Sequence, residues 1–368
     1  MKVLHLLDSL NRGGAEMQAL DTARNAGRFG IELTIVSAGP GMLQTDFASS
    51  GVQFIPLRRK LPVDLYLASQ IRSIIRDRKI QLVRGFQPVD GLHLYLASRG
   101  LRDVRQVLSF EGFIPDRKNR LTAKFLIPKM HANIVVSRGL KKWLAEKDGL
   151  DTNKFNVIHN GADPERLKPA ARTLRKELNI TGNELIFGMI GNFYRDPRKD
   201  QLTLAKALPR IFDRYPHAHC IFAGGVETGA EDKMAECLDI CLQQGLTERV
   251  HFLGSRGDVP NILAEMDIFI FSSLQEGLPV AASEAMLAGV PMIVSDIEPL
   301  LEATGGGEFA AVFPVGDANT LAEKTIHLLQ NDAERLALGA KAKEFAQANF
   351  SIDSHLRDLK RLYAGLIT

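Results

Sequence analysis

Short apolar runs of strand length alternate with amphipathic runs of helix length along nearly the whole sequence. Parallel strands need a crossover connection, usually a helix, so this alternation predicts a doubly wound parallel sheet of the α/β class. The expected strands are Val3–Leu7, Leu33–Ser37, Gln53–Pro56, Leu82–Gly85, Arg105–Ser109, Ile134–Val136, Phe155–Ile158, Leu185–Ile190, Cys220–Ala223, Val250–Leu253, Ile268–Phe271, Met292–Val294 and Ala311–Phe313. The expected helices between them include Glu16–Asn25, Leu65–Arg78, Asn119–Met130, Gln201–Phe212, Asn261–Met266 and Val280–Ala288.

The alternation starts twice, on either side of a segment rich in turn signals. Residues 159–182 contain Asn160-Gly161, Asp163-Pro164 and Lys168-Pro169, which is typical of turns and linkers. The 368 residues are enough for two domains of ordinary size. We therefore expect two Rossmann-like domains, residues 1–168 and 169–350, and a final helix at 351–368.

Composition excludes several classes of protein. The hydrophobic fraction of 45% argues against disorder, and no apolar run approaches the roughly 20 residues needed to span a bilayer. The first residues are typical of a strand rather than a signal peptide, because the apolar run is short and lacks a cleavage site. Three cysteines without metal-ligand spacing suit reduced thiols. We expect a cytoplasmic protein.

Charge divides unevenly along the chain. The first 168 residues hold 27 Lys and Arg against 16 Asp and Glu, whereas the remainder holds 19 against 27. The stretch Arg117–Lys147 also interleaves basic with apolar residues, which suits an anionic membrane face or a lipid-diphosphate acceptor. Lysine side chains lying along an ordinary soluble surface would give the same pattern. Nucleic acid is not expected as a partner, since aromatic residues are few and no reading motif occurs.

The stretch Ser272–Pro291, SSLQEGLPVAASEAMLAGVP, follows an expected buried strand and enters a helix. Pro279 suits the first helical position, and Gly289 with Pro291 suits the stop. Backbone N–H groups at the start of this helix would favour an anion. The residues that would form this anion site are Gly277, Leu278, Pro279 and Val280. Two carboxylates, Glu276 and Glu284, bracket the site and could accept hydrogen bonds from sugar hydroxyls.

This pattern resembles the signature of the family 4 retaining glycosyltransferases. It consists of Glu276 and Glu284 eight residues apart, together with Gly277, Pro279, Gly289 and Pro291. The resemblance implies that Glu276 lies against the donor sugar and that Glu284 binds the ribose of a nucleotide. It also implies the GT-B fold, with two Rossmann-like domains facing a cleft and the final helix returning to the first domain. A surface helix with two solvated glutamates is the alternative.

A basic loop follows the first expected strand of the second domain. Transfer of a sugar from a nucleotide diphosphate builds negative charge on the leaving group, which cations must stabilise. The chain contains no Asp-x-Asp, so we expect no metal bound in that way. The run Asp196-Pro197-Arg198-Lys199 resembles the phosphate-binding lysine loop of the family, which implies that Lys199 is the main cation. The family also has an arginine that partners this lysine, and its position falls near Asn192–Arg195. We expect Arg195 to be this arginine, with Arg198 as the alternative. A solvated basic loop would look similar.

Two further segments resemble ligand-binding loops of the family. Gly13 and Gly14 follow the first strand and open a helix, but they do not form the G-x-G-x-x-G dinucleotide motif. The resemblance implies that they lie near the diphosphate and the acceptor, although a plain tight turn is possible. The strand ending at Leu253 and Gly254 resembles the family's base-binding segment.

One position departs from the family pattern. After the strand Arg105–Ser109, many members carry a histidine before a glycine, and Glu111 stands there in this chain. Its carboxylate could accept a hydrogen bond from an acceptor hydroxyl or act as its base. It could equally mark a changed acceptor or reduced activity.

Together these observations and the resemblance to family 4 imply a metal-independent glycosyltransferase. Retention of the anomeric configuration is implied by the resemblance alone. The donor would be a nucleotide-diphosphate sugar, with a UDP-sugar favoured, and the acceptor a glycan or a lipid-linked diphosphate. We expect a role in surface polysaccharide synthesis, with peripheral contact at the cytoplasmic membrane face. A nucleotide-sugar epimerase and a non-catalytic, glycosyltransferase-like partner subunit are the alternatives.

Overall fold

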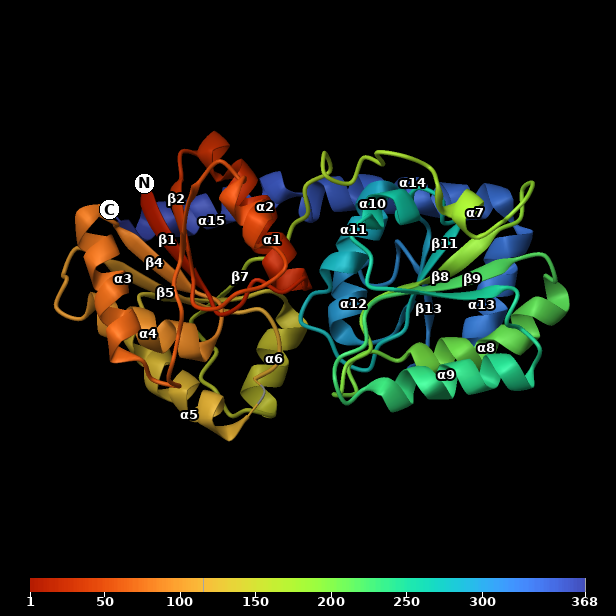
Figure 1. Ribbon diagram of the computed structural model, residues 1–368, viewed down its shortest axis with the longest axis horizontal. Coiled ribbons are helices and arrows are strands. Elements are labelled where there is room, and N and C mark those ends of the chain that lie inside the picture. The colour runs from red at the N-terminus through yellow and green to blue at the C-terminus, as the bar shows by residue number, and fades with distance from the viewer. Residues whose placement is uncertain (115, 368) are drawn as a thin grey trace. The chain divides into compact units, whose positions relative to one another are not determined.

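The computed structural model describes residues 1–114 and 116–367. The chain divides into two compact units, each built on a parallel sheet covered by helices (Figure 1). Unit 1 contains Met1–Ala162 and the C-terminal segment from Ile352, and unit 2 contains Asp163–Ser351. The expected boundary after residue 168 therefore falls inside unit 2.

Unit 1 contains a seven-stranded parallel sheet in the order β3-β2-β1-β4-β5-β6-β7. The strands are β1 (Lys2–Leu7), β2 (Glu32–Ser37), β3 (Gln53–Pro56), β4 (Leu82–Gly85), β5 (Arg105–Phe110), β6 (Ala132–Val135) and β7 (Phe155–Val157). The helices are α1 (Gly14–Asn25), α2 (Gln44–Ala48), α3 (Leu65–Asp77), α4 (Pro88–Ser98), α5 (Arg117–Leu126), α6 (Arg138–Glu146) and α15 (Ile352–Ile367), with 3₁₀ turns at Ala26–Phe29 and Ile127–Lys129.

The core of unit 1 has two apolar layers because successive side chains of a strand point to opposite faces. On β1, Val3 and Leu7 pack into a cluster with residues of α1 and of α15. Leu4 and Leu6 pack into a second cluster with residues of α3 and α4. Helices thus bury both faces of the sheet, which explains why the strands are apolar runs rather than alternating ones.

Unit 2 contains a six-stranded parallel sheet in the order β10-β9-β8-β11-β12-β13. The strands are β8 (Ile186–Ile190), β9 (His219–Ala223), β10 (Val250–Gly254), β11 (Ile268–Phe271), β12 (Met292–Ser295) and β13 (Ala311–Phe313). The helices are α7 (Leu174–Glu177), α8 (Gln201–Arg214), α9 (Glu231–Gln243), α10 (Val259–Leu263), α11 (Val280–Ala288), α12 (Glu298–Ala303), α13 (Ala318–Gln330) and α14 (Asp332–Asn349). Side chains of α8, α9 and α13 share one core with the sheet.

Both sheets have a switch point at which the strand order reverses. In unit 1 it lies between β1 and β4, and in unit 2 between β8 and β11. Loops that leave the carboxyl ends of these strand pairs run in opposite directions, which opens a crevice suited to ligands. The loops after β1, β4, β8 and β11 are therefore the candidate ligand-binding loops.

The expected strands all form, whereas several helix boundaries differ. The helix expected at Asn119–Met130 ends at Leu126 and continues as a 3₁₀ turn containing Pro128. A proline lacks the N–H that an α-helical hydrogen bond needs. The helix expected at Asn261–Met266 begins earlier, at Val259. Pro279 immediately precedes α11 instead of being its first residue. No helix in the described part of the chain is long and apolar enough to cross a membrane.

Candidate active site

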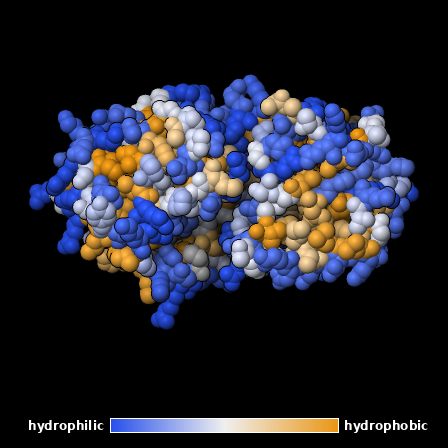
Figure 2. Space-filling view, viewed as in Figure 1, coloured by the Kyte–Doolittle hydropathy of each residue, from blue (hydrophilic) through white to orange (hydrophobic). Residues whose placement is uncertain are grey.

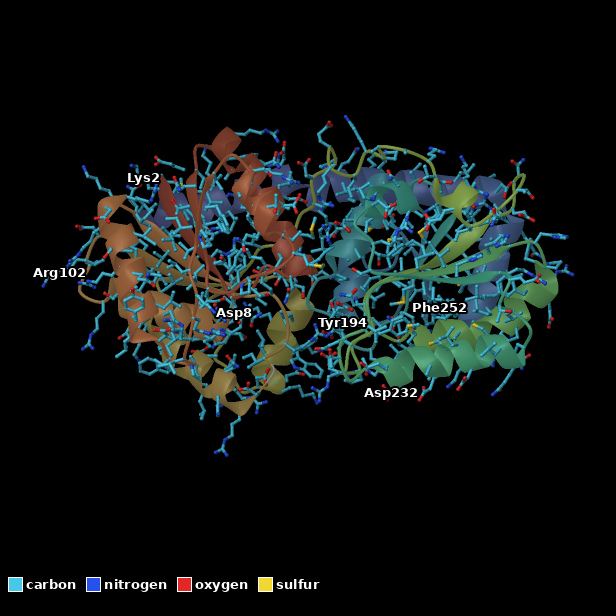
Figure 3. The ribbon with its side chains drawn as sticks, viewed as in Figure 1. Lys2, Asp8, Arg102, Tyr194, Asp232 and Phe252 are labelled. Atoms are coloured by element: carbon cyan, nitrogen blue, oxygen red, sulfur yellow. The ribbon has the colours of Figure 1, made fainter. Side chains whose placement is uncertain are left out.

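The loops after β8 and β11 meet at the switch point of unit 2. Lys199 lies in the loop after β8, and its backbone forms an isolated antiparallel bridge with Ser273 in the loop after β11. This pairing brings Lys199 and Glu276 together although 77 residues separate them in sequence. The loop after β8 also contains Tyr194, which Figure 3 labels together with Phe252 of β10, the strand beyond β9.

Lys199 and Glu276 form a nearly buried ion pair. Lys199 Nζ lies 2.6 Å from Glu276 Oε1, and each side chain is about 10% exposed. The ammonium also sits 3.9 Å from the centroid of the Phe271 ring, whose π face attracts a cation. Burial lowers the pKa of Lys199, and the charge of Glu276 opposes that shift. The site thus holds a cation and a carboxylate in one low-dielectric pair.

Glu276 is oriented by a second partner as well. Ser273 Oγ lies 2.7 Å from Glu276 Oε1 and also close to the carbonyl of Arg198, so its single hydroxyl proton is shared between these two acceptors. The serine therefore links the two loops and fixes the carboxylate between them. Neither Ser273 nor Phe271 was singled out from the sequence, although both lie within five residues of Glu276 on the strand and turn that precede it.

Two arginines precede Lys199, and the structure separates them. Arg195 is exposed, its backbone N–H donates to Glu227 Oε2 at 2.8 Å, and its side chain packs against Gly229. Arg198 is bound by both oxygens of Asp196 and stacks on the ring of Tyr194 at 4.7 Å. Arg198 also lies within electrostatic range of Glu276. Arg195 therefore points toward the loop after β9, while Arg198 lies beside the Lys199–Glu276 pair.

Glu284 lies on α11, beyond the turn that carries Glu276. Its Oε1 pairs with Arg166 Nη2 at 2.6 Å, and both side chains are largely buried. Gly277, Leu278 and Val280 form the buried entry to this helix with Pro279, and Gly289 ends it with a left-handed φ of 84°. Arg166 comes from the start of unit 2, 118 residues away, so no local signal in the sequence could have indicated it.

Asn192 connects the loops after β8 and β9. Its Oδ1 accepts from the backbone N–H of Gly225 at 2.9 Å, and its carbonyl accepts from Gln201 Nε2. The loop after β9 in turn donates from Gly224 to the carbonyl of Gly254 at 2.8 Å. Leu253 and Gly254 end β10, where Gly254 adopts a left-handed φ of 64°. Asn192, Gly225, Leu253 and Gly254 therefore lie at the carboxyl ends of the strands, as Lys199 does.

In unit 1, Gly13 caps α1 and Gly14 is its first residue. A Cβ placed on Gly13 would lie 2.7 Å from Glu16 Oε2, because Glu16 folds back over the helix start in the manner of a capping box. Burial raises the pKa of Glu16, with smaller contributions from the charges of Glu111 and Asp8. The Glu16 carboxylate thus lies against the start of α1, which is the helix start that we expected to lie near a diphosphate.

Glu111 follows β5 and is paired with Arg84 of β4. Arg84 Nη2 lies 3.1 Å from Glu111 Oε1, and the two side chains are 2% and 3% exposed. Arg84 Nε also donates to Ser109 Oγ at 2.7 Å, and Asn160 lies close to the same carboxylate. Burial raises the pKa of Glu111, and the charge of Arg84 opposes that shift. The sequence gave no sign of this partner.

The described residues contain no group of three or more His, Cys, Asp or Glu side chains that could hold a metal ion. In unit 2, Lys199 and Glu276 pair at the switch point, and Glu284 lies on the adjoining helix. Asn192 links this region to the loop after β9, whereas Leu253 and Gly254 lie two strands away at the end of β10. Gly13, Gly14 and Glu111 belong to unit 1.

Comparison with known proteins shows the family of this chain. The family profile described as Glycosyltransferase Family 4 matches residues 12–166, and that described as Glycosyl transferases group 1 matches residues 184–331. An Escherichia coli protein named UDP-Gal:alpha-D-GlcNAc-diphosphoundecaprenol alpha-1,3-galactosyltransferase is 27% identical over 81% of this chain and 78% of its own length. The Campylobacter jejuni N,N'-diacetylbacillosaminyl-diphospho-undecaprenol alpha-1,3-N-acetylgalactosaminyltransferase is 33% identical over 74% of this chain and 67% of its own length.

Solved structures show the same fold. Anabaena Alr3699/HepE in complex with UDP and glucose superposes with a TM-score of 0.86, at 20% identity, covering 99% of this chain and all of that one. A glycosyltransferase from Rickettsia africae superposes with a TM-score of 0.85, at 18% identity, covering 100% of this chain and 98% of that one. The two-domain GT-B architecture is thereby confirmed. The chain belongs to the family 4 glycosyltransferases.

Proposed function

We propose that this glycosyltransferase takes its sugar from a nucleotide-diphosphate donor bound by unit 2, with retention of the anomeric configuration. The Lys199–Glu276 ion pair at the switch point carries the proposal. A donor diphosphate would replace Glu276 as the counterion of Lys199, and Glu276 would then be free to accept a hydrogen bond from the donor sugar. Lys199 would stabilise the charge that develops on the leaving phosphate.

We assign the second cation at the leaving group to Arg198, because it lies beside the Lys199–Glu276 pair whereas Arg195 points toward the loop after β9. Asp196 neutralises Arg198 as Glu276 neutralises Lys199, and the donor diphosphate would replace both carboxylates. In this front-face reaction the bond from the anomeric carbon to the phosphate oxygen breaks as the acceptor oxygen bonds to the same carbon. The acceptor's proton passes to the departing phosphate, so no carboxylate nucleophile is required.

The nucleoside would lie along the remaining residues of this edge. Glu284 would accept from the ribose hydroxyls, with Arg166 holding the carboxylate in place. Backbone groups of Leu253 and Gly254 would hold the base, and backbone groups from Gly277 to Val280 would face the phosphates. We favour UDP because the Anabaena protein of similar fold was solved with UDP and with UDP-glucose.

The acceptor would be a lipid-linked diphosphate sugar or a related glycan of surface polysaccharide synthesis. The names of the Escherichia coli and Campylobacter jejuni relatives both specify a diphosphoundecaprenol acceptor. We assign the acceptor to unit 1, with Glu111 as a hydrogen-bond acceptor for its hydroxyl, held by Arg84. Gly13 and Gly14 would line the same region.

A membrane-bound acceptor implies contact with the membrane face. Unit 1 exposes four apolar side chains by 49% to 69%, namely Leu61, Val63, Leu65 and Tyr66. They follow the exposed basic residues Arg58 and Lys60 and flank the buried Asp64. Figure 2 shows apolar residues, in orange, among hydrophilic ones on the visible surface. We propose that this segment, Arg58–Tyr66, adds to the expected basic stretch Arg117–Lys147 in peripheral contact with an anionic membrane.

A thermal-shift screen of UDP, GDP, ADP and CMP tests the donor site. A ligand that binds only the folded state raises stability by mass action, by about 2.7 kcal/mol at a hundredfold excess over Kd. We expect one nucleotide to raise the Tm of the wild type, and the shift to disappear in Glu284→Gln. Glu323→Gln, an exposed residue of α13, serves as the matched control and should keep the shift. If no nucleotide shifts the wild type, the donor-site assignment is wrong.

A further inference from the structure

The loop after β8 contains the two cations proposed to meet the donor diphosphate, and an isolated bridge holds each end of this loop. Phe193 pairs with Val226 of the loop after β9, and Lys199 pairs with Ser273 of the loop after β11. Between these two bridges the chain bends and turns over residues 195–198. The position of the second cation therefore depends on what holds this turn.

Lys233, in the first turn of α9, holds the turn through its backbone. Its Nζ donates to the carbonyl of Tyr194 and to the carbonyl of Asp196, each at 2.7 Å. Figure 3 labels Tyr194 and also Asp232, the residue that precedes Lys233 on α9. Hydrogen bonds from a charged donor are stronger than those between neutral groups. Lys233 therefore fixes the backbone on both sides of Arg195.

The turn folds the Asp196 carboxylate back onto Arg198. Asp196 Oδ1 accepts from Arg198 Nε at 2.7 Å and from the backbone N–H of Arg198 at 3.1 Å, and Oδ2 accepts from Nη2 at 2.5 Å. Burial alone would raise the pKa of Asp196, but the hydrogen bonds and charge of Arg198, together with the charge of Lys233, lower it. The carboxylate is therefore ionised and neutralises Arg198 in this structure.

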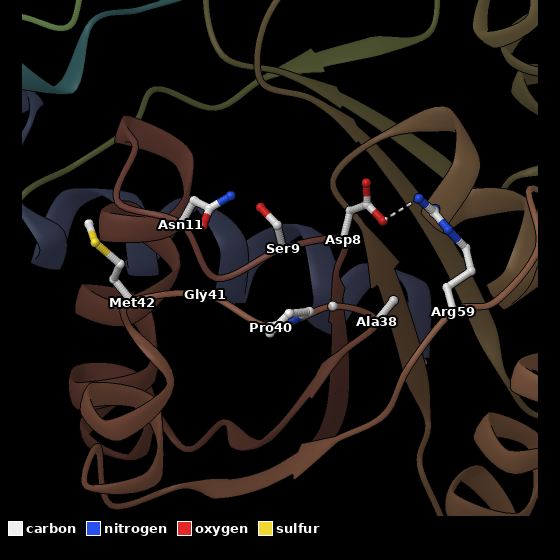
Figure 4. Close-up of a pocket in the computed structure, with 9 residues that line it drawn as sticks. Asp8, Ser9, Asn11, Ala38, Pro40, Gly41, Met42 and Arg59 are labelled. Atoms are coloured by element: carbon white, nitrogen blue, oxygen red, sulfur yellow. Dashed lines mark ion pairs between the residues drawn. The ribbon is translucent and has the colours of Figure 1, made fainter. Parts of the chain in front are cut away.

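An arginine–aspartate pair of unit 1 shows by contrast why this carboxylate can be displaced. Arg59 Nη2 lies 2.8 Å from Asp8 Oδ1 (Figure 4), and these residues come from the loops after β3 and β1, so breaking their pair would release one loop from the other. Asp196 and Arg198 are two residues apart in one turn, and their side chains are 43% and 42% exposed. The Asp196 carboxylate can therefore rotate away from Arg198 while Lys233 keeps the turn in place.

A diphosphate that takes the place of Asp196 on Arg198 leaves two anions side by side. Like charges at short range repel, so the displaced carboxylate needs a cation of its own.

Lys233 can supply that cation. An ammonium has three N–H donors, and the two carbonyls of the turn are the hydrogen-bond partners of Lys233 among the described residues, so one donor remains. Lys233 also lies within electrostatic range of the Asp196 carboxylate. We propose that Lys233 is a positioning residue of the donor site, which holds the turn for Arg198 and pairs with the Asp196 carboxylate when a diphosphate displaces it. The inference rests on the proposed function, in which Arg198 and Lys199 meet the donor diphosphate.

Binding titrations of UDP, GDP and ADP, each beside its own nucleoside, test this role, because only the diphosphate part meets Arg198. Calorimetry suits the diphosphates, and ligand-detected NMR suits the weaker nucleosides. We expect Lys233→Met to weaken binding of the nucleoside diphosphate about tenfold, as the loss of charge-assisted hydrogen bonds would, and to leave its nucleoside unaffected. Lys233→Arg keeps a charged donor and should recover most of the affinity. Lys324→Met, which changes an exposed lysine of α13, is the matched control and should bind like the wild type.

Asp196→Asn separates the two parts of this role. It removes the anion that must be displaced, so it should bind the nucleoside diphosphate more tightly than the wild type. In the Asp196→Asn background, Lys233→Met should cost only about threefold, because the hydrogen bonds to the turn are lost but no displaced carboxylate needs a partner. Equal costs in both backgrounds, or a Lys233→Met protein that binds the diphosphate as tightly as the wild type, overturn the inference and leave the donor site standing. If none of the three diphosphates binds the wild type, the proposed donor site fails and the inference fails with it.

Discussion

At the scale of single residues, the Lys199–Glu276 pair has a structural role that can be measured apart from the chemical role proposed for it. Both side chains are about 10% exposed, and each would be left with an uncompensated charge if the other were removed. Breaking a buried pair in this way costs about 3–5 kcal/mol, although replacing both members costs far less. In the proposed reaction, Lys199 would also supply the cation at the leaving phosphate. The contribution of the ion pair to the free energy of unfolding can therefore be measured separately from its proposed role in donor binding.

We predict that Lys199→Met lowers the free energy of unfolding of unit 2 by about 3 kcal/mol, because Glu276 then stays buried without its cation. In the double variant Lys199→Met, Glu276→Gln, the loss should be clearly smaller than the sum of the two single losses. Urea denaturation of the four proteins gives the coupling energy. The exposed pair Arg210–Glu323 is the control, with an expected coupling below about 1 kcal/mol. Additive effects at Lys199 and Glu276 would contradict the prediction.

At the scale of elements, α15 is the part of unit 1 contributed by the end of the chain. Four of its side chains are fully buried on the face of the sheet that α1 also covers, namely those of Ile352, Leu356, Leu359 and Tyr363. The same helix buries His355, whose Nδ1 lies 2.7 Å from the carbonyl of His159. Burial, with the charge of Arg84, lowers the pKa of His355 to about 3. A helix that buries a neutral histidine couples the stability of unit 1 to pH.

The sign of this coupling follows from the pKa values. Unfolded His355 takes up a proton near pH 6.5, whereas the folded form resists it until about pH 3. Its contribution to stability is therefore complete above pH 6.5 and is lost as the pH falls toward 3, by up to roughly 5 kcal/mol. We predict that His355→Gln flattens the pH dependence of unit 1 in this window. Fluorescence of Trp143, the single tryptophan and part of α6, reports that unfolding.

The control for this pH prediction is His217→Gln, which changes an exposed histidine of unit 2. It should leave the pH profile of the Trp143 signal unchanged. A profile for His355→Gln that still falls as steeply as that of the wild type would show that other groups, such as buried His5, dominate the acid sensitivity.

At the scale of the whole molecule, the sequence predicted what depends on local pattern. The thirteen strands were found because each is a short apolar run, and the turn around Glu276 was found because glycine and proline mark it. Contacts between distant segments could not be found in this way. Arg166 pairs with Glu284 across 118 residues, and Arg84 pairs with Glu111 from a neighbouring strand. These contacts depend on the fold, which brings distant segments together. The fold also places Arg198, and not Arg195, beside Lys199.

Charge and exposed apolar surface are the other properties of the whole chain that bear on function. The first 168 residues carry 27 basic and 16 acidic side chains, and the Arg58–Tyr66 segment of unit 1 adds exposed leucines to that basic surface. Basic residues near an anionic bilayer contribute about 1 kcal/mol each. Apolar side chains that enter the interface add a contribution that salt does not screen. The electrostatic and apolar contributions to membrane binding can therefore be distinguished by their dependence on salt concentration.

We predict that the protein sediments with vesicles containing phosphatidylglycerol but not with purely zwitterionic vesicles. Raising the salt concentration should weaken binding, because the electrostatic part is screened. The double variant Leu61→Ser, Leu65→Ser should bind more weakly at every salt concentration, because it removes only the apolar part. Leu336→Ser, equally exposed but on unit 2, should bind like the wild type. If the Leu61, Leu65 variant bound as tightly as the wild type while salt still released both, contact would rest on charge alone, and the basic stretch Arg117–Lys147 would be the remaining candidate.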